Sequence, residues 1–199
     1  MNRLVSLSSL VLALGAAGSA SAGITIASSM EGYQNAIAGR GYDTASFLGA
    51  SIAASAGGAG WNAWSASASP GGLYTAGVLS TLDSDAALTI SFVAKSVNAV
   101  GGNFYITDAS RQVAVNSLVE IMLDNGEVYV SDNSAANFAG FVADANQYIS
   151  SITIKPMLSS GPGESQYATV GSMIVSGVPA PGSLALLGAA GLAARRKRR

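Results

Sequence analysis

The second half of the chain alternates apolar and polar residues with a period of two, and this pattern limits the fold more than any other feature. Leu88, Ile90 and Phe92 share one face of such a segment, and the residues between them are polar. Successive side chains of a β-strand point to opposite faces, so this alternation predicts a half-buried strand. The same pattern predicts further strands, whose inward residues are Phe104 and Ile106; Val119, Ile121 and Leu123; Val128 and Val130; Ile152 and Ile154. A last strand is predicted over 167–175.

Segment 124–127, Asp-Asn-Gly-Glu, lies between two of these strands. Asn-Gly between alternating runs favours a two-residue hairpin loop, which pairs Leu123 with Val128 and keeps Val130 on the same apolar face. The two acidic residues of the segment would then face each other, a repulsion that solvation or a bound cation relieves. Short strands, closely spaced turns and the lack of a long amphipathic helix together predict an all-β fold, an antiparallel β-sandwich.

The first half of the body differs in composition from the second. From Ala27 to Gly77 it is rich in Ala, Gly and Ser and has few branched residues. Small side chains bury little apolar area, so this region predicts long loops and short edge strands.

The chain contains no cysteine and no histidine. This excludes disulfides, zinc sites built on those residues, cysteine nucleophiles and the Ser-His-Asp triad. The chemistry that is left uses carboxylates, hydroxyl–lysine pairs or metals with oxygen ligands, such as calcium.

The overall net charge of −1 combines two opposite regions. Five of the ten basic residues lie in the last five positions, whereas residues 23–176 carry four basic against eleven acidic residues, a net charge of −7. An acidic body without a basic stripe predicts no nucleic-acid partner.

Residues 1–22 have the features of a secretory signal peptide. Arg3 supplies the positive start, a short apolar run follows, and Ala20-Ser21-Ala22 fits the small-residue cleavage pattern, which makes Gly23 the expected mature N-terminus. The alternative is an N-terminal membrane anchor, but the apolar run is short for a hydrocarbon core of roughly 30 Å.

The C-terminal segment 177–199 has three parts in a fixed order. A proline motif comes first, an apolar stretch over 182–194 follows, and a basic cluster ends the chain. The motif consists of Val178, Pro179, Ala180 and Pro181; the cluster consists of Arg195, Arg196, Lys197, Arg198 and Arg199. The apolar stretch predicts a short membrane helix of about 20 Å, and the basic cluster predicts a stop on the cytoplasmic side.

This tail resembles the PEP-CTERM sorting signal of Gram-negative bacteria, with Ala180 where the family has Glu. The body adds weaker similarity in Val100–Asp108, in Phe138-Ala139-Gly140-Phe141 and in Ile149–Ile154. The resemblance implies a jelly-roll-like body, a sorting enzyme of the exosortase kind as partner, and a host that makes extracellular polysaccharide. It implies transient membrane anchoring and then a place on the cell surface or outside the cell. The alternative is an ordinary C-terminal anchor that is never cleaved.

Two groups of residues are candidate sites. Trp61, Trp64 and Tyr74 are candidate ligand-binding aromatics, because sugar rings pack on flat exposed aromatic faces; the alternative is that they fill a core poor in large residues. Asp83 and Asp85 are candidate calcium ligands, and the alternative is that they are solvated turn residues.

No spacing of carboxylates in the sequence marks a catalytic pair. We therefore expect an exported, non-catalytic surface or matrix protein without a cofactor, sorted through its tail and associated with extracellular polysaccharide. The first alternative is a carbohydrate-binding module, either calcium-dependent or independent of calcium. The second is a secreted glycoside hydrolase.

Overall fold

The computed structural model describes residues 23–45, 47–49, 51–53, 55–58, 63–93, 96–115, 117–144, 146–157 and 165–177. These residues form strands and one short helix. In chain order they are β1 (Ile24–Ala27), α1 (Met30–Ala36), β2 (Gly41–Ala45), β3 (Ser51–Ala53), β4 (Ser55–Gly58), β5 (Trp64–Ser69), β6 (Leu73–Thr75), β7 (Leu79–Thr81), β8 (Ala87–Phe92), β9 (Val97–Thr107), β10 (Leu118–Leu123), β11 (Val128–Asp132), β12 (Ala139–Ala143), β13 (Ser151–Met157) and β14 (Tyr167–Gly177).

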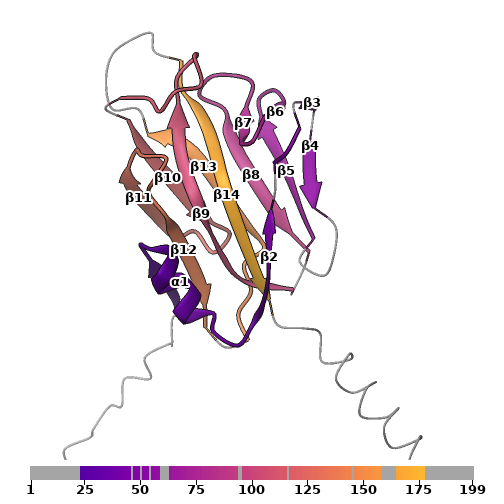
Figure 1. Ribbon diagram of the computed structural model, residues 1–199, viewed down its shortest axis with the longest axis vertical. Coiled ribbons are helices and arrows are strands. Elements are labelled where there is room, and N and C mark those ends of the chain that lie inside the picture. The colour runs from indigo at the N-terminus through magenta and orange to yellow at the C-terminus, as the bar shows by residue number, and fades with distance from the viewer. Residues whose placement is uncertain are drawn as a thin grey trace, which may run out of the picture.

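The strands form two antiparallel sheets, and the predicted all-β sandwich is confirmed. One sheet has the order β1-β12-β9-β14-β7-β6-β3, with β2 also paired to β14. The other has the order β11-β10-β13-β8-β5-β4. Strands β9 and β14 are the longest, and they run side by side through the molecule (Figure 1).

The hydrophobic core lies between the sheets and follows the predicted alternation. Leu88, Ile90 and Phe92 are buried, as are the inward residues predicted for β9, β10 and β13. The smaller residues between them on β8 are half-buried or exposed. Burial of one face per sheet fixes the register of each strand, because a one-residue shift would turn the apolar set to solvent.

The register predicted for the β10–β11 hairpin is wrong. Met122, and not Leu123, pairs with Val128, because the loop holds three residues and Gly126 takes a positive φ of 88°. A hairpin of this length places its glycine in the left-handed region. The shift by one residue turns Val128 and Val130 outward, 53% and 41% exposed, and brings Tyr129 onto the core side.

The same shift changes the place of the two acidic residues of this loop. The carboxylate of Asp124 accepts a hydrogen bond from the backbone N–H of Ser150, at 3.0 Å. The backbone carbonyl of Glu127 accepts from the N–H of Leu123, at 2.9 Å. Glu127 therefore lies opposite Leu123 in the hairpin. The prediction that Asp124 and Glu127 face each other is wrong.

Helix α1 packs on the outer face of the eight-stranded sheet. Ser29 caps its N-terminus by accepting from the N–H of Gly32, at 3.1 Å. Tyr33 is fully buried over the paired glycines Gly101 and Gly140, where an added Cβ would come within 3.2 Å and 2.5 Å of its ring. Gly101 and Gly140 thus form the surface on which the helix packs.

The first half of the body contains short strands, as expected, but the sequence pattern did not show α1. Nor are all of these strands at edges, since β5 lies between β4 and β8, and β6 lies between β3 and β7. None of the helices in the described part of the chain is long and apolar enough to cross a membrane.

Both ends of the described body lie at the same end of the eight-stranded sheet. Ile24 pairs with Ala143 at the start of β1, and Gly177 pairs with Val97 at the end of β14. Because β12 is paired to β9 at this level, the two chain ends leave from one side of the domain. The opposite end carries the segment that follows Thr107.

Candidate functional site

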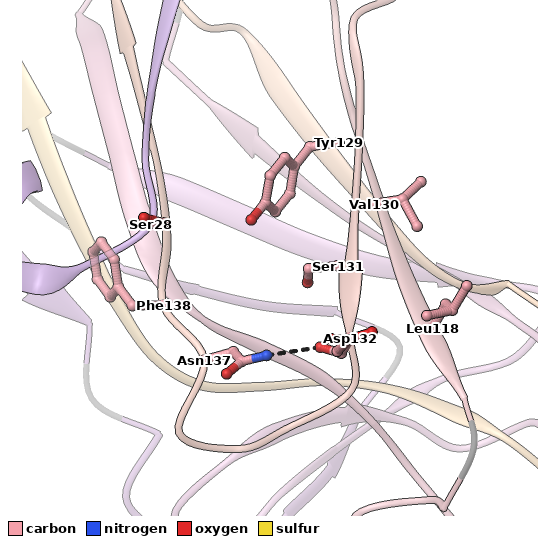
Figure 2. A pocket seen from close by; sticks show the side chains of 8 residues that line it. All are labelled: Ser28, Leu118, Tyr129, Val130, Ser131, Asp132, Asn137 and Phe138. Atoms are coloured by element: carbon pink, nitrogen blue, oxygen red, sulfur yellow. Dashed lines mark hydrogen bonds between the residues drawn. The ribbon is translucent and has the colours of Figure 1, made fainter.

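A cleft opens where the two sheets end beside each other. Strand β11 is the terminal strand of the six-stranded sheet, and β1 is the terminal strand of the other. The cleft has a volume of about 510 Å³. Its lining residues come from the end of β1, the start of β10, strand β11 and the segment before β12: Ser28, Leu118, Tyr129, Val130, Ser131, Asp132, Asn137 and Phe138 (Figure 2).

Strand β11 places alternate side chains on the two sides of this edge. Tyr129 and Ser131 lie on the side that faces Ser28 and Phe138, whereas Val130 points to the other side (Figure 2). The Tyr129 ring packs edge-on against Phe141, with ring centroids 5.8 Å apart. The ring is therefore held by the core, while its hydroxyl points toward the cleft.

The facing wall is fixed by hydrogen bonds and by ring packing. The side-chain amide of Asn137 donates to the backbone carbonyl of Asp132, at 2.9 Å. The backbone carbonyl of Asn137 accepts from the side-chain amide of Asn103, at 3.1 Å. The ring of Phe138 packs against Tyr33 at 5.5 Å. Both walls are thus formed before any ligand arrives.

The cleft offers hydroxyl and amide groups beside aromatic rings. Among the described residues that line it, Asp132 supplies the one carboxylate. As a terminal strand, β11 also presents backbone N–H and C=O groups along its outer edge. Such a combination suits a ligand that has several hydroxyl groups and an apolar face.

Sequence reasoning missed this site because it depends on the hairpin register. The predicted register put Val128 and Val130 in the core, which would have turned Tyr129 to solvent. The sequence signal that could have found the site is Asp124-Asn125-Gly126. If these residues form a three-residue loop, the side chains of β11 exchange faces and Tyr129 turns to the core side.

Two of the predicted aromatic residues, Trp64 and Tyr74, lie in different sheets. Trp64 begins β5 in the six-stranded sheet and packs edge-on against Phe47, at 5.8 Å. Tyr74 lies on β6 in the other sheet, where the guanidinium carbon of Arg111 is 5.2 Å from its ring centre. Trp61 lies outside the described residues. The partly buried Trp64 thus takes the packing role that was the alternative for the tryptophans.

Asp83 and Asp85 lie in the exposed turn between β7 and β8. Asp85 has a positive φ of 60°, and its backbone N–H donates to the carbonyl of Gln166, at 2.7 Å. Within the described part of the chain, His, Cys, Asp and Glu nowhere gather in a group of three or more that could hold a metal ion.

The two terminal segments lie largely outside the described residues. These include the cleavage residues Ala20 and Ala22, the proline motif 178–181 and the basic cluster 195–199. Gly23 is described, and its carbonyl accepts from the N–H of Asp144, at 3.2 Å. Strand β1 begins directly after it.

The chain matches no family model and no curated protein. Among solved structures it is similar to a family two carbohydrate esterase from Cellvibrio japonicus, with a TM-score of 0.34 and 13% sequence identity. The similarity covers 67% of this chain and 36% of that chain, so the chain spans well under half of the esterase's length. A likeness of this degree carries no argument about activity, and the fold is established by the strand pairing described above.

Proposed function

We propose that the protein is an exported, non-catalytic saccharide-binding domain that associates with extracellular polysaccharide through the cleft beside β11. The observation that carries this proposal is the composition of the cleft: the hydroxyls of Tyr129 and Ser131 and the amide of Asn137 lie around aromatic rings at an open strand edge.

The chemistry of these groups matches that of a sugar. Saccharide hydroxyls both donate and accept hydrogen bonds, as do the tyrosine and serine hydroxyls and the asparagine amide. The C–H face of a sugar ring packs on aromatic rings such as that of Tyr129. The volume of about 510 Å³ lies within the roughly 300–1,000 Å³ range of small-molecule sites.

The carboxylate arrangement favours binding over hydrolysis. Glycoside hydrolysis generally uses two carboxylates on either side of the scissile bond. In the part of the chain that the structure describes, the cleft is lined by one carboxylate, that of Asp132. A secreted hydrolase therefore stays the less favoured candidate.

Export and sorting complete the proposal. They rest on the signal-peptide features of residues 1–22 and on the resemblance of segment 177–199 to the PEP-CTERM signal. An exosortase-like enzyme is the proposed partner of that tail. Because both ends of the body leave from one side, the loops at the opposite end point away from an attached membrane.

A glycan array with the full chain in detergent tests the binding proposal. We expect binding to at least one class of polysaccharide fragment. Tyr129→Phe combined with Ser131→Ala should weaken that binding roughly tenfold or more, because two hydroxyls are lost. Tyr148→Phe, a half-exposed tyrosine outside the cleft, is the matched control and should bind like the unmodified chain.

Two results separate the alternatives. Binding that a calcium chelator abolishes would favour the calcium-dependent module. If no glycan binds to a folded chain, or if the double substitution leaves affinity unchanged, the cleft is not the saccharide site.

A further inference from the structure

A second cavity, of about 380 Å³, lies at the end of the domain opposite Gly23 and Gly177. Its polar lining residues are Asp108, Ser110, Ser165 and Gln166. Val115, which is 76% exposed, and two alanines form its apolar wall. The described lining residues of this cavity and those of the cleft beside β11 do not overlap.

Gln166 is the most informative residue of the cavity. Its side chain is 3% exposed, and its Nε2 donates to the hydroxyl of Ser117, at 2.9 Å. Its backbone carbonyl accepts from the N–H of Asp85. The amide oxygen Oε1 is buried and has no hydrogen-bond partner. A buried acceptor without a partner is destabilising, so an occupant of the cavity that draws the Gln166 amide toward it would relieve this cost.

Asp108 is held in place by its own turn. Its Oδ1 accepts from the backbone N–H groups of Ser110 and Gln112, at 2.8 and 3.0 Å. Arg111, in the same turn, packs between Tyr74 and Tyr167 on the outer face of the sheet and so fixes the loop. The carboxylate is therefore positioned at the cavity before a ligand arrives.

We propose that this cavity is a second saccharide-binding site, so that one chain binds two polysaccharide segments and cross-links them. This inference rests on the proposed function. In this proposal the Asp108 carboxylate accepts hydrogen bonds from sugar hydroxyls, and Val115 with its neighbouring alanines packs against the C–H face of the ring.

The size and the charge of the cavity favour a sugar over a metal ion. A calcium ion takes roughly six to eight oxygen ligands at 2.3–2.6 Å, usually with several carboxylates among them. Among the described residues that line this cavity, Asp108 supplies the one carboxylate, and the volume lies within the range of small-molecule sites.

Isothermal titration calorimetry of the full chain in detergent tests the second site. The probes are the hexasaccharides of cellulose, xylan and mannan. We expect two sites per chain for the hexasaccharide that binds. Val115→Trp fills the cavity from an exposed position and should reduce the number to one. Leu48→Trp, at a position that is 86% exposed and outside both cavities, is the control and should keep two.

A milder variant removes the charged acceptor without filling the space. Asp108→Asn keeps the oxygen that caps the turn, and it should weaken one of the two sites about tenfold or more.

The long polymer of the same sugar should precipitate with the unmodified chain. It should stay in solution with Val115→Trp and with the Tyr129→Phe, Ser131→Ala variant, because each of them retains a single site.

The outcomes distinguish this inference from the proposed function. One site that Val115→Trp leaves unchanged, and that the Tyr129→Phe, Ser131→Ala variant abolishes, overturns the second site and retains the first. No binding by the unmodified chain overturns both. A shift of the Gln166 side-chain amide resonance with calcium chloride alone, and not with the hexasaccharide, would make the cavity a cation site and the inference wrong.

Discussion

Arg111 makes both ring contacts and hydrogen bonds on the outer face of the eight-stranded sheet. Its guanidinium carbon lies 5.2 Å from the Tyr74 ring centre and 4.3 Å from that of Tyr167. Its Nη1 donates to the Ser80 hydroxyl and to the Thr81 carbonyl, both at 2.9 Å. The residue has a positive φ of 62°, and its contacts offset the cost of that conformation.

Beneath Arg111, three hydroxyls form a buried chain across neighbouring strands. Ser80 and Thr169 lie 2.9 Å apart, and Thr169 and Thr107 lie 3.1 Å apart. On an open sheet face these hydroxyls would be in water, yet each is at most 2% exposed. Arg111 donates a hydrogen bond to the Ser80 hydroxyl at one end of this chain. Loss of that hydrogen bond should therefore weaken the hydrogen bonds among all three hydroxyls.

Replacement of Arg111 by Met should lower the free energy of unfolding by about 2 kcal/mol, through loss of two hydrogen bonds and two cation–π contacts. Arg111→Lys should lose less stability than Arg111→Met but should not match the unmodified chain. An ammonium group lacks the planar guanidinium geometry that stacks on the rings and donates in fixed directions. Urea unfolding at pH 7 measures both variants.

Lys155→Met is the control for Arg111. It breaks the ion pair with Glu120, at 2.8 Å, and the lysine side chain is 43% exposed. Exposed ion pairs contribute about 0–1 kcal/mol, so the loss should be small. An equal loss in the two variants would contradict the role given to Arg111.

Because of Tyr33, the free energy of unfolding depends on pH in the alkaline range. Burial raises the pKa of its hydroxyl well above the usual value, and the nearby Arg40 opposes this only in part. Burial also raises the pKa of Tyr105. The folded protein therefore keeps protons that the unfolded chain releases, so stability is intact below about pH 10 and falls as the pH rises further.

The variant Tyr33→Phe should lessen this alkaline loss. Because the pKa of Tyr33 is raised well above its usual value, this tyrosine contributes a slope that approaches about 1.4 kcal/mol per pH unit above pH 10, and the variant should lower the slope by up to that amount. Urea unfolding at several pH values measures the slope, and Tyr105 accounts for part of what is left. An unchanged slope in Tyr33→Phe would show that Tyr33 ionises freely in the folded state.

At the scale of elements, the register of the β10–β11 hairpin determines which side chains of β11 face the cleft at the edge of the six-stranded sheet. The loop pairs Glu127 with Leu123, so Tyr129 faces the core side and the two valines face out. Asn125 supports the turn, since its side-chain oxygen accepts from the N–H of Glu127, at 2.9 Å. A single residue of loop length therefore determines whether Tyr129 lines the cleft.

Gly126→Ala should cost about 1–2 kcal/mol, because an L-residue with a side chain is strained in the left-handed region. An added Cβ would meet no atom within 4 Å, so the cost comes from the backbone alone. Thermal unfolding should show a Tm lower by roughly 2–6 °C.

Gly126→Asn is the matched variant and should cost less, since asparagine tolerates this conformation better than alanine does. If Asn proved as costly as Ala, or if neither changed the Tm, the strain at Gly126 would not be what sets the loop.

At the scale of the whole molecule, the domain has one end that leads to the terminal segments and one that carries the second cavity. Ile24 and Gly177 define the first end, and Thr107 with Tyr167 defines the second. The cleft beside β11 lies at a side edge between them. A chain held by its tail would thus keep both proposed sites open to polysaccharide.

Cell fractionation tests the proposed export and sorting. The full chain should be recovered with the membrane, at the cell surface or outside the cell. Neutral residues in place of Arg195–Arg199 should weaken retention at the membrane, because the basic cluster holds the tail on the cytoplasmic side. Arg40→Gln, a single change in the body, is the control and should leave the distribution unchanged. Recovery of the full chain only in the cytoplasm would end the proposal.

The period-two alternation determined the class of fold and most of the core, because a strand with one buried face allows only one set of inward residues. Leu88, Ile90 and Ile121 are buried as it predicted. The sequence alone also removed every chemistry that needs cysteine or histidine.

The tertiary structure alone decided the features that depend on distant contacts. Tyr33 of α1 fits over glycines 68 and 107 residues further along the chain, Gly101 and Gly140, and no local periodicity records that fit. The cleft beside β11 combines residues from Ser28 to Phe138, and its aromatic wall depends on the hairpin register. Alternation specifies which residues share a face, but loop geometry and long-range packing determine which face is buried and what lies across from it.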